Sequence, residues 1–235
     1  MNLKSLLPYW LRQTIKRRVF AFQDMHARLA NLRRAGFHPV GAVDGGAFDG
    51  DWAQEFWRTW PSCPVMMVEP QAECRERLME HAGKAPGSIV CTCAISDRSG
   101  RAAFRYQETN SAIVDAADAA DDDGVEVRTL AELLSGHDGF DANLLKLDLQ
   151  GHELKALAGA GRSLPGFEVI ILEMSLIGID GMPEFHEVHS WLDANGYRLY
   201  DVLPMYYRPR DGALWQMDAF YVRKDSALCQ SKQWN

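Results

Sequence analysis

The chain has 235 residues, a hydrophobic content of 47% and a formal net charge of −7. This length and composition fit one α/β domain with a short appendage and exclude global disorder. The negative charge argues against general nucleic-acid binding, which needs a basic face. No apolar run reaches the length of about 18 residues that a membrane-spanning helix requires.

The N-terminal stretch, MNLKSLLPYWLRQTIKRRVF, places its main basic cluster after its apolar residues. A secretory signal has the opposite order and ends in small residues, so we do not expect one here. Two interpretations stay open for residues 1–22. They form a helix docked on the domain, or a basic amphipathic segment that contacts an anionic membrane face or a partner.

The elements expected along the chain begin with an N-terminal helical extension over residues 1–36, which Gly36 ends. Short apolar runs then alternate with amphipathic stretches over 37–225, which indicates βαβ units and a mostly parallel sheet, before a tail at 226–235. Strands are expected at about 40–44, 65–69, 89–95, 144–148, 168–173, 197–203 and 217–223. Helices are expected at about 50–59, 71–82, 129–135, 152–163 and 184–195, with a capping box of Thr129 and Glu132.

Three segments interrupt this alternation. Residues 98–107 are expected to form a short hairpin on Ser99-Gly100, and the acidic stretch at 115–124 a solvated loop. Residues 204–216 favour a surface hairpin with Asp211-Gly212 at its tip. The alternative for that segment is a platform of aromatic and arginine side chains suited to a carbohydrate.

The cysteines are odd in number and include no C-x-x-C pair; they are Cys63, Cys74, Cys91, Cys93 and Cys229. This pattern favours buried, reduced thiols in a cytoplasmic protein over a metal site, although the second interpretation stays open.

Residues 43–52, VDGGAFDGDW, join an expected strand to an expected helix through a glycine-rich turn. A strand, a glycine turn and a helix make the first half of a nucleotide-binding βαβ unit. On the G-x-G-x-x-G template the three positions are Gly45, Ala47 and Gly50, which is a weak match by itself.

Acidic residues at successive strand ends indicate which ligand this turn binds. Asp44 would repel a pyrophosphate but attract the ammonium and sulfonium of S-adenosylmethionine. Glu69 is suited to accept hydrogen bonds from both ribose hydroxyls. After the third strand, Ser96 precedes Asp97, whose carboxylate would accept the adenine amino group. The sequence therefore favours S-adenosylmethionine, with a ligand-free α/β domain as the alternative.

The chain resembles the FkbM family of S-adenosylmethionine-dependent methyltransferases over roughly residues 38–224. The resemblance rests on VDGGAFDGDW, VEP, AISDRSG, ILEMSL, NGY and QMDAFYVRK, and most strongly on LLKLDLQGHELKALAGA at 144–160. It implies a Rossmann-like class I methyltransferase fold: a mostly parallel seven-stranded sheet with helices on both faces. It also implies methyl transfer to oxygen. Phe48 stands where the broader methyltransferase turn has glycine, a variation that the family tolerates.

The expected cofactor-binding residues are Asp44, Gly45, Gly46, Ala47, Phe48, Gly50, Glu69, Pro70, Ser96 and Asp97. The catalytic candidates are Asp148, His152 and Glu173, because the carboxyl ends of neighbouring strands border one cleft and an alcohol acceptor needs a general base. Local hydrogen bonding in the turn and metal ligation are the alternative roles for Asp148 and His152. Glu153 is equally compatible with stabilising a helix N-terminus. No metal ligand is assigned.

The sequence thus predicts an S-adenosylmethionine-dependent O-methyltransferase that acts on a hydroxyl of a glycan or related natural product. Its partner would be a small-molecule or glycan acceptor and not nucleic acid. The expected location is the cytoplasm, with membrane association through residues 1–22 as the alternative. The rival interpretations are a nicotinamide-dependent oxidoreductase and a non-catalytic protein that retains the fold.

Overall fold

The computed structural model describes residues 25–105, 112–114, 124–178 and 182–231. The expectations for residues 1–24, and for nearly all of the acidic stretch at 115–124, lie outside them.

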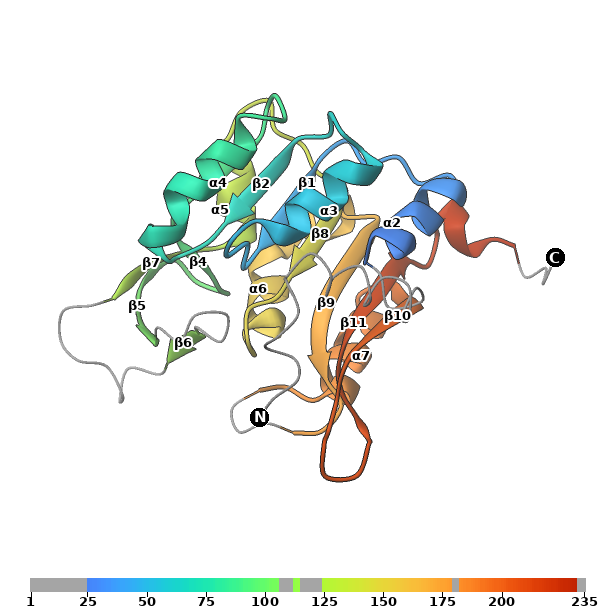
Figure 1. The fold of residues 1–235 in the computed structure, drawn as a ribbon. Helices are drawn as coiled ribbons and strands as arrows, with labels where there is room; N and C mark the ends of the chain where they lie inside the picture. Colours follow the sequence, from blue (N-terminus) through green and yellow to red (C-terminus); the bar gives the residue numbers. More distant parts are fainter. Residues whose placement is uncertain (1–24, 106–111, 115–123, 179–181, 232–235) are drawn as a thin grey trace, which may run out of the picture.

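A seven-stranded sheet forms the centre of the described fold, in the order β10-β11-β9-β8-β1-β2-β3 (Figure 1). Its parallel strands are β1 (Ala42–Gly45), β2 (Val65–Val68), β3 (Ile89–Cys91), β8 (Leu144–Leu147) and β9 (Val169–Ser175). The antiparallel strands are β10 (Tyr197–Tyr207) and β11 (Leu214–Arg223), of which β11 pairs with β9. The expected mostly parallel, seven-stranded sheet is confirmed.

Helices cover both faces of this sheet. The helices α2 (Met25–Arg34), α3 (Asp51–Thr59) and α4 (Arg75–Ala82) pack into one apolar cluster. The helices α5 (Leu130–Ser135), α6 (Glu153–Ala160) and α7 (Phe185–Ala194) pack into the other. Three short 3-10 turns complete the described helical elements: η3 (Ala72–Cys74), η6 (Gly161–Gly166) and η7 (Ala227–Cys229). All five helices expected after residue 36 are present, and the Thr129–Glu132 capping box of α5 is confirmed.

The strands form where apolar runs are buried on both sides. All four residues of β2 are buried, and they alternate between the two apolar clusters. A strand that is covered on both faces has an uninterrupted apolar sequence, because both of its side-chain rows meet helices. For this reason such strands can be predicted from their runs of apolar residues.

A second, four-stranded sheet corrects one expectation. Its order is β4 (Ala94–Ile95), β7 (Val125–Arg128), β5 (Gly100–Arg105) and β6 (Ala112–Val114). The hairpin expected within 98–107 is wrong, because β5 pairs with β6 and β7 instead of folding back on itself. The strand expected at 89–95 is divided between the two sheets.

The N-terminal extension and the tail are joined to the central fold where the structure describes them. Arg28 of α2 forms an ion pair with Asp201 at 3.0 Å, and Arg33 donates a hydrogen bond to the carbonyl of Thr59 at 2.8 Å. Leu228 and Cys229 of η7 pack against the same apolar cluster as α2. Within the described ranges, no helix is both long and apolar enough to cross a bilayer.

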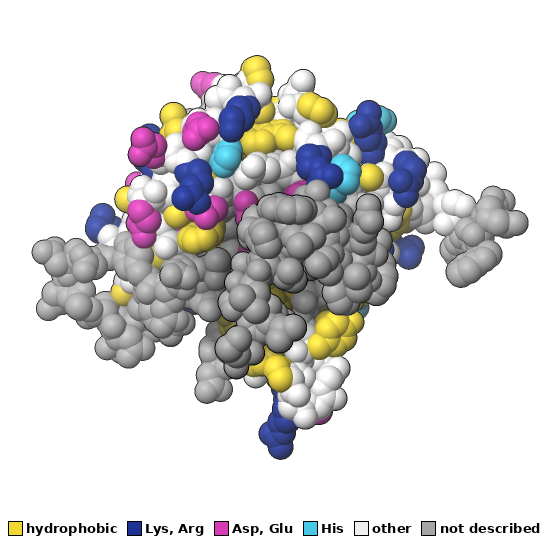
Figure 2. All heavy atoms as spheres, in the orientation of Figure 1, with side chains coloured by type: hydrophobic (Ala, Val, Ile, Leu, Met, Phe, Trp, Pro, Cys, Tyr) yellow, Lys and Arg dark blue, Asp and Glu magenta, His cyan; other side chains and the backbone are white. Residues whose placement is uncertain are grey.

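Side chains of both charges are interspersed on the upper part of the face in Figure 2. The five thiols are free; Cys74, Cys91 and Cys93 are buried, while Cys63 and Cys229 are partly exposed. Burial raises the pKa of the Cys93 thiol to about 12. Three of the thiols are buried, as expected, and their reduced state stays a prediction.

Candidate functional site

A cavity of about 370 Å³ opens at the carboxyl ends of the parallel strands. Its walls include the turn after β1, the end of β2, the segment around β4 and the turn after β8. The volume falls in the range typical of small-molecule sites, and the position is where open α/β sheets bind ligands.

In the turn after β1, the backbone of Gly46 lies very close to the backbone of Asp148, which follows β8. The φ of Gly46 is +75°, and a β-carbon built on Gly46 would lie 1.9 Å from the carbonyl oxygen of Asp148. Phe48, two residues later, also has a positive φ of +43°. The backbone at Phe48 therefore keeps the left-handed conformation that favours glycine, although its side chain is large.

Hydrogen bonds to the carboxylate of Glu69 link this turn to the end of β2. One carboxylate oxygen accepts a hydrogen bond from the amide of Phe48 at 2.9 Å, and the other accepts from the amide of Gln71 at 3.0 Å. Burial raises the pKa of Glu69, and the two backbone hydrogen bonds oppose that rise. Each carboxylate oxygen has two lone pairs, so Glu69 can accept further bonds from a ligand. Ala47 and Pro70 line the cavity beside it.

The side chain of Asp44 lies fully buried in the protein interior and not in the cavity wall. The ammonium of Lys146 lies 3.2 Å from one carboxylate oxygen, and neither oxygen accepts a well-formed hydrogen bond within the described residues. The charge of Asp44 therefore bears on the cavity wall through Lys146, and a direct contact with the cofactor stays a prediction.

Lys146 connects Asp44 to the cavity wall. Its ammonium also donates to the carbonyl of Gly46 at 3.3 Å and lies 3.8 Å from the carboxylate of Asp148. Burial lowers the pKa of the ammonium, but the carboxylates of Asp44, Asp148 and Asp218 outweigh burial and raise it. Lys146 therefore remains a cation at neutral pH.

Two further glycines of the turn pack against the protein and not against the cavity. A β-carbon on Gly45 would lie 2.7 Å from the side chain of Leu147 and 2.9 Å from that of Ile95. A β-carbon on Gly50, which precedes α3, would lie 2.9 Å from the ring of His81. Neither glycine lines the cavity. They allow close packing around the turn, and their direct contact with the cofactor stays a prediction.

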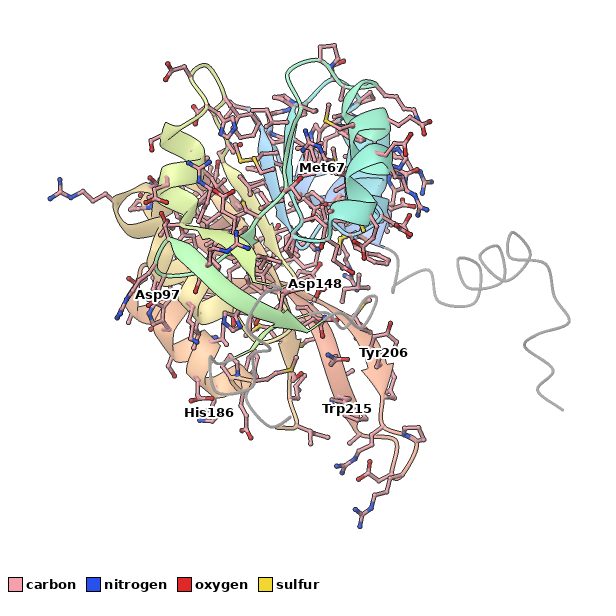
Figure 3. All side chains as sticks on the ribbon, turned by 90° about the vertical axis from the view of Figure 1, so that its left-hand side faces the viewer. Met67, Asp97, Asp148, His186, Tyr206 and Trp215 are labelled. Carbon is pink, nitrogen blue, oxygen red and sulfur yellow. The ribbon has the colours of Figure 1, made fainter. Side chains whose placement is uncertain are left out.

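Ser96 and Asp97 also lie outside the cavity lining. A β-carbon on Gly159 would lie 2.1 Å from the carbonyl oxygen of Ser96, so this segment packs tightly on α6. Figure 3 shows Asp97 well apart from Asp148. The wall near β4 is formed by Cys93, Ala94 and Ile95 instead. A contact of Ser96 or Asp97 with the cofactor stays a prediction.

The catalytic candidates Asp148, His152 and Glu173 all line the cavity. The side-chain amide of Gln150 donates to Asp148 at 2.8 Å and to Glu173 at 2.9 Å. Gln150 has a positive φ of +51°, so a strained backbone presents its amide between the two carboxyl groups. The fold thus brings the three candidates to one cavity, and the Gln150 amide links Asp148 to Glu173.

Asp218 extends this cluster from β11. It is the cross-strand partner of Glu173 and lines the same cavity. Burial, together with the nearby charge of Asp148, raises the pKa of Glu173 to about 9. The same two causes raise the pKa of Asp218 to about 7. Glu173 is therefore protonated at neutral pH and can donate a hydrogen bond, while Asp148 is left to accept.

Glu153 stabilises the turn after β8 and does not line the cavity. Its buried carboxylate accepts hydrogen bonds from the amides of Leu149 at 2.8 Å and Gly151 at 3.1 Å. Burial raises its pKa to about 7. Between the two roles expected from the sequence, this geometry favours the structural one.

The hairpin of β10 and β11 borders the cavity through Met205. Tyr206 and Tyr207 are 56% and 51% exposed, and Figure 3 shows Tyr206 and Trp215 on this hairpin. Arg208 forms an ion pair with Asp211 at the tip, where Gly212 has a φ of +73°. The expected surface hairpin is confirmed.

The histidines of α7 lie outside the cavity lining. His186 is exposed, while His189 is partly buried, stacks on Phe185 and shares a hydrogen bond with Tyr221 at 3.1 Å. His189 therefore has a packing role. Among the described residues, no group of three His, Cys, Asp or Glu side chains is placed to hold a metal ion.

Lys146 and Asp218 are the site residues that sequence reasoning missed. Each is a charged residue inside an otherwise apolar strand, in LLKL and in QMDAFYV. Such a residue needs a partner of opposite charge or a hydrogen-bonding network when its strand is buried, and this was the available signal.

The raised pKa values give a testable pH dependence. Glu173, Asp218 and Glu153 bind protons more tightly in the folded than in the unfolded chain. The free energy of unfolding should therefore fall as pH rises from about 5 to 8, between the unfolded and folded pKa values. We expect Glu173→Gln to reduce this slope in urea unfolding, and the exposed Glu126→Gln to leave it unchanged. Equal slopes in native protein and Glu173→Gln would contradict the assignment.

Known proteins resemble this chain in sequence and in fold. A family model described as the methyltransferase FkbM domain matches residues 44–199, more than half of the chain. The hexuronic acid methyltransferase AglP of Haloferax volcanii is 27% identical over 120 residues, which are 49% of this chain and 48% of AglP. The crystal structure of methyltransferase FkbM from Methylobacillus flagellatus KT shares the fold with a TM-score of 0.50 and 16% identity, covering 76% of this chain and 43% of that chain. The chain spans about half the length, or less, of these two relatives.

Proposed function

Because the chain belongs to the methyltransferase FkbM domain family, we propose that it transfers the methyl group of S-adenosylmethionine to a hydroxyl of a glycan or related natural product. The observation that supports this most directly is the Asp148–Gln150–Glu173 bridge beside the glycine turn, in one cavity. The glycan class draws on AglP, whose name describes hexuronic acid methylation.

The cavity has the chemistry that this cofactor requires. Gly46 leaves space where any side chain would collide with Asp148. Glu69 has acceptor capacity suited to ribose hydroxyls, and Pro70, Ala94 and Ile95 offer apolar contact for a purine. Carboxylates elsewhere in the lining suit the cationic methionine end. When bound, S-adenosylmethionine supplies a methyl group already activated by its sulfonium.

The protein's own contribution would be alignment and proton removal. Asp148 accepts the proton of the acceptor hydroxyl, since Gln150 holds its carboxylate and leaves lone pairs available. Glu173 orients the acceptor as a protonated donor. His152 also lines the cavity, at the turn before α6, and is the second candidate for the base.

Calorimetric titration and a turnover assay test this proposal together. The protein is expected to bind S-adenosylhomocysteine and not NAD. Asp148→Asn should retain this binding while methyl transfer falls roughly 10²–10⁴-fold, the usual contribution of a general base. His186→Ala, at an exposed position outside the cavity, is the matched control for both measurements.

Binding of NAD without S-adenosylhomocysteine would favour an oxidoreductase and end the proposal. Full turnover by Asp148→Asn would show that Asp148 is not the general base and would leave His152 as the candidate. A biological role that survives Asp148→Asn with turnover lost would favour a non-catalytic function.

A further inference from the structure

Among the described residues, acidic side chains outnumber basic ones in the lining of the cavity, although Asp49 and Glu55 form ion pairs with Arg77 and Arg58. The acidic side chains come from the turn after β1, from α3, from the ends of β2, β8 and β9, and from the middle of β11. They are Asp49, Asp51, Glu55, Glu69, Asp148, Glu173 and Asp218. From the described residues, Lys146 and His152 are the basic side chains in the lining.

Lys146 has little capacity to bind an anionic ligand. Its ammonium contacts Asp44 at 3.2 Å, the carbonyl of Gly46 at 3.3 Å and the carboxylate of Asp148 at 3.8 Å. An ammonium has three hydrogen-bond donors, and these protein oxygens already surround it. A ligand carboxylate would have to displace one of them.

Two arginines beside the lining are also paired with carboxylates of the protein. Arg77 forms an ion pair with Asp49, and Arg208 forms one with Asp211 at the hairpin tip. An Arg fork is the usual means of binding a carboxylate in two places. These two arginines are occupied by protein carboxylates.

The part of the cavity beside the catalytic candidates is the acidic one. Asp148 and Asp218 line it together with Met205 of the hairpin and with Glu173, which is protonated and uncharged at neutral pH. A carboxylate on the acceptor would meet repulsion here, in surroundings of low dielectric.

We propose that the acceptor is a sugar without a carboxylate, and that the cavity's acidic lining discriminates against uronic acids. This inference rests on the proposed function and specifies its substrate class. It separates the chain from AglP, the relative named for hexuronic acid. A neutral sugar suits the cluster because its hydroxyls donate hydrogen bonds to carboxylates, while a uronate adds a like charge.

The test uses glycan pairs that differ only at carbon 6, a hydroxymethyl group in a terminal glucose and a carboxylate in a terminal glucuronate. Radiolabelled S-adenosylmethionine reports methyl transfer to each member. We expect kcat/KM to be at least about tenfold higher for the glucose member, equivalent to roughly 1.4 kcal/mol. Asp218→Asn and Glu55→Gln each remove a lining charge and should lower that ratio roughly threefold or more.

Glu80→Gln is the matched control, since its side chain on α4 is 73% exposed and lies outside the lining. It should leave the ratio unchanged. Equal or better transfer to glucuronate overturns the charge selection while leaving methyl transfer intact. Methylation of neither member by protein that binds S-adenosylhomocysteine overturns the sugar acceptor and the inference with it.

Discussion

Lys146→Met is expected to lower the free energy of unfolding by about 3–5 kcal/mol at pH 7, the usual cost of removing one partner from a buried ion pair. Asp44 is fully buried, and the Lys146 ammonium 3.2 Å away is its compensating charge. Methionine fills a similar volume but leaves the carboxylate uncompensated. Urea unfolding followed by circular dichroism measures the loss.

The pH dependence identifies the cause of this loss. Burial already raises the pKa of Asp44, and the loss of the cation raises it further. Asp44 then becomes protonated as pH falls, which removes the buried charge, so the deficit of Lys146→Met should shrink between pH 7 and pH 5. Adding Asp44→Asn should recover part of the stability at pH 7.

An exposed lysine provides the comparison. Lys84 pairs with Glu80 at 3.5 Å, with side chains 62% and 73% exposed. Such surface pairs contribute about 0–1 kcal/mol, so Lys84→Met should change stability little. If Lys146→Met lowered the free energy of unfolding as little as Lys84→Met, the ion pair between Lys146 and Asp44 would not stabilise the folded chain.

Gly46→Ala is expected to lower stability by about 2–5 kcal/mol and to abolish measurable binding of S-adenosylhomocysteine. Two effects add: a left-handed conformation costs alanine about 1–2 kcal/mol, and overpacking costs about 1–3 kcal/mol. The new β-carbon would lie 1.9 Å from the carbonyl oxygen of Asp148. The turn would have to move away from β8, which would distort the cavity wall.

Gly212→Ala separates the two effects. Gly212 has nearly the same φ, +73°, but a β-carbon added there, at the hairpin tip, would meet no heavy atom within 4 Å among the described residues. It should lose only the conformational part, about 1–2 kcal/mol, and retain cofactor binding. Equal losses in both variants would mean that the contact between Gly46 and Asp148 is unimportant.

The central sheet was predictable because its strands are buried on both faces. The runs at 65–68 and 169–172 are uninterrupted by polar residues, so their strand character is visible without any tertiary information. The second sheet was not predictable in the same way. The pairing of β5 with β7 joins residues on opposite sides of the acidic stretch, and no local pattern specifies a partner that far along the chain.

The site was predictable to the extent that strand ends define it. Asp148 and Glu173 were found because each ends a strand at the same edge of the sheet. Asp44 and Asp97 were expected beside them, but Asp44 is buried and Asp97 is exposed, and neither lines the cavity. The sequence does not tell whether a strand-end side chain turns into a cavity, into the core or to the surface. Asp218 depends on the register of an antiparallel pair, which only the folded chain fixes.

That register also determines where the chain tolerates changes in length. Glu173 faces Asp218 because β9 and β11 pair residue by residue, and inserting one residue within β11 before Asp218 would turn its side chain to the opposite face. The connection between Arg208 and Ala213 lies beyond this pairing with β9. Loop insertions there would lengthen the hairpin while Glu173 and Asp218 keep their register. The hairpin tip is therefore the position at which this part of the chain can change length, by design or in evolution, without moving the two carboxyl groups.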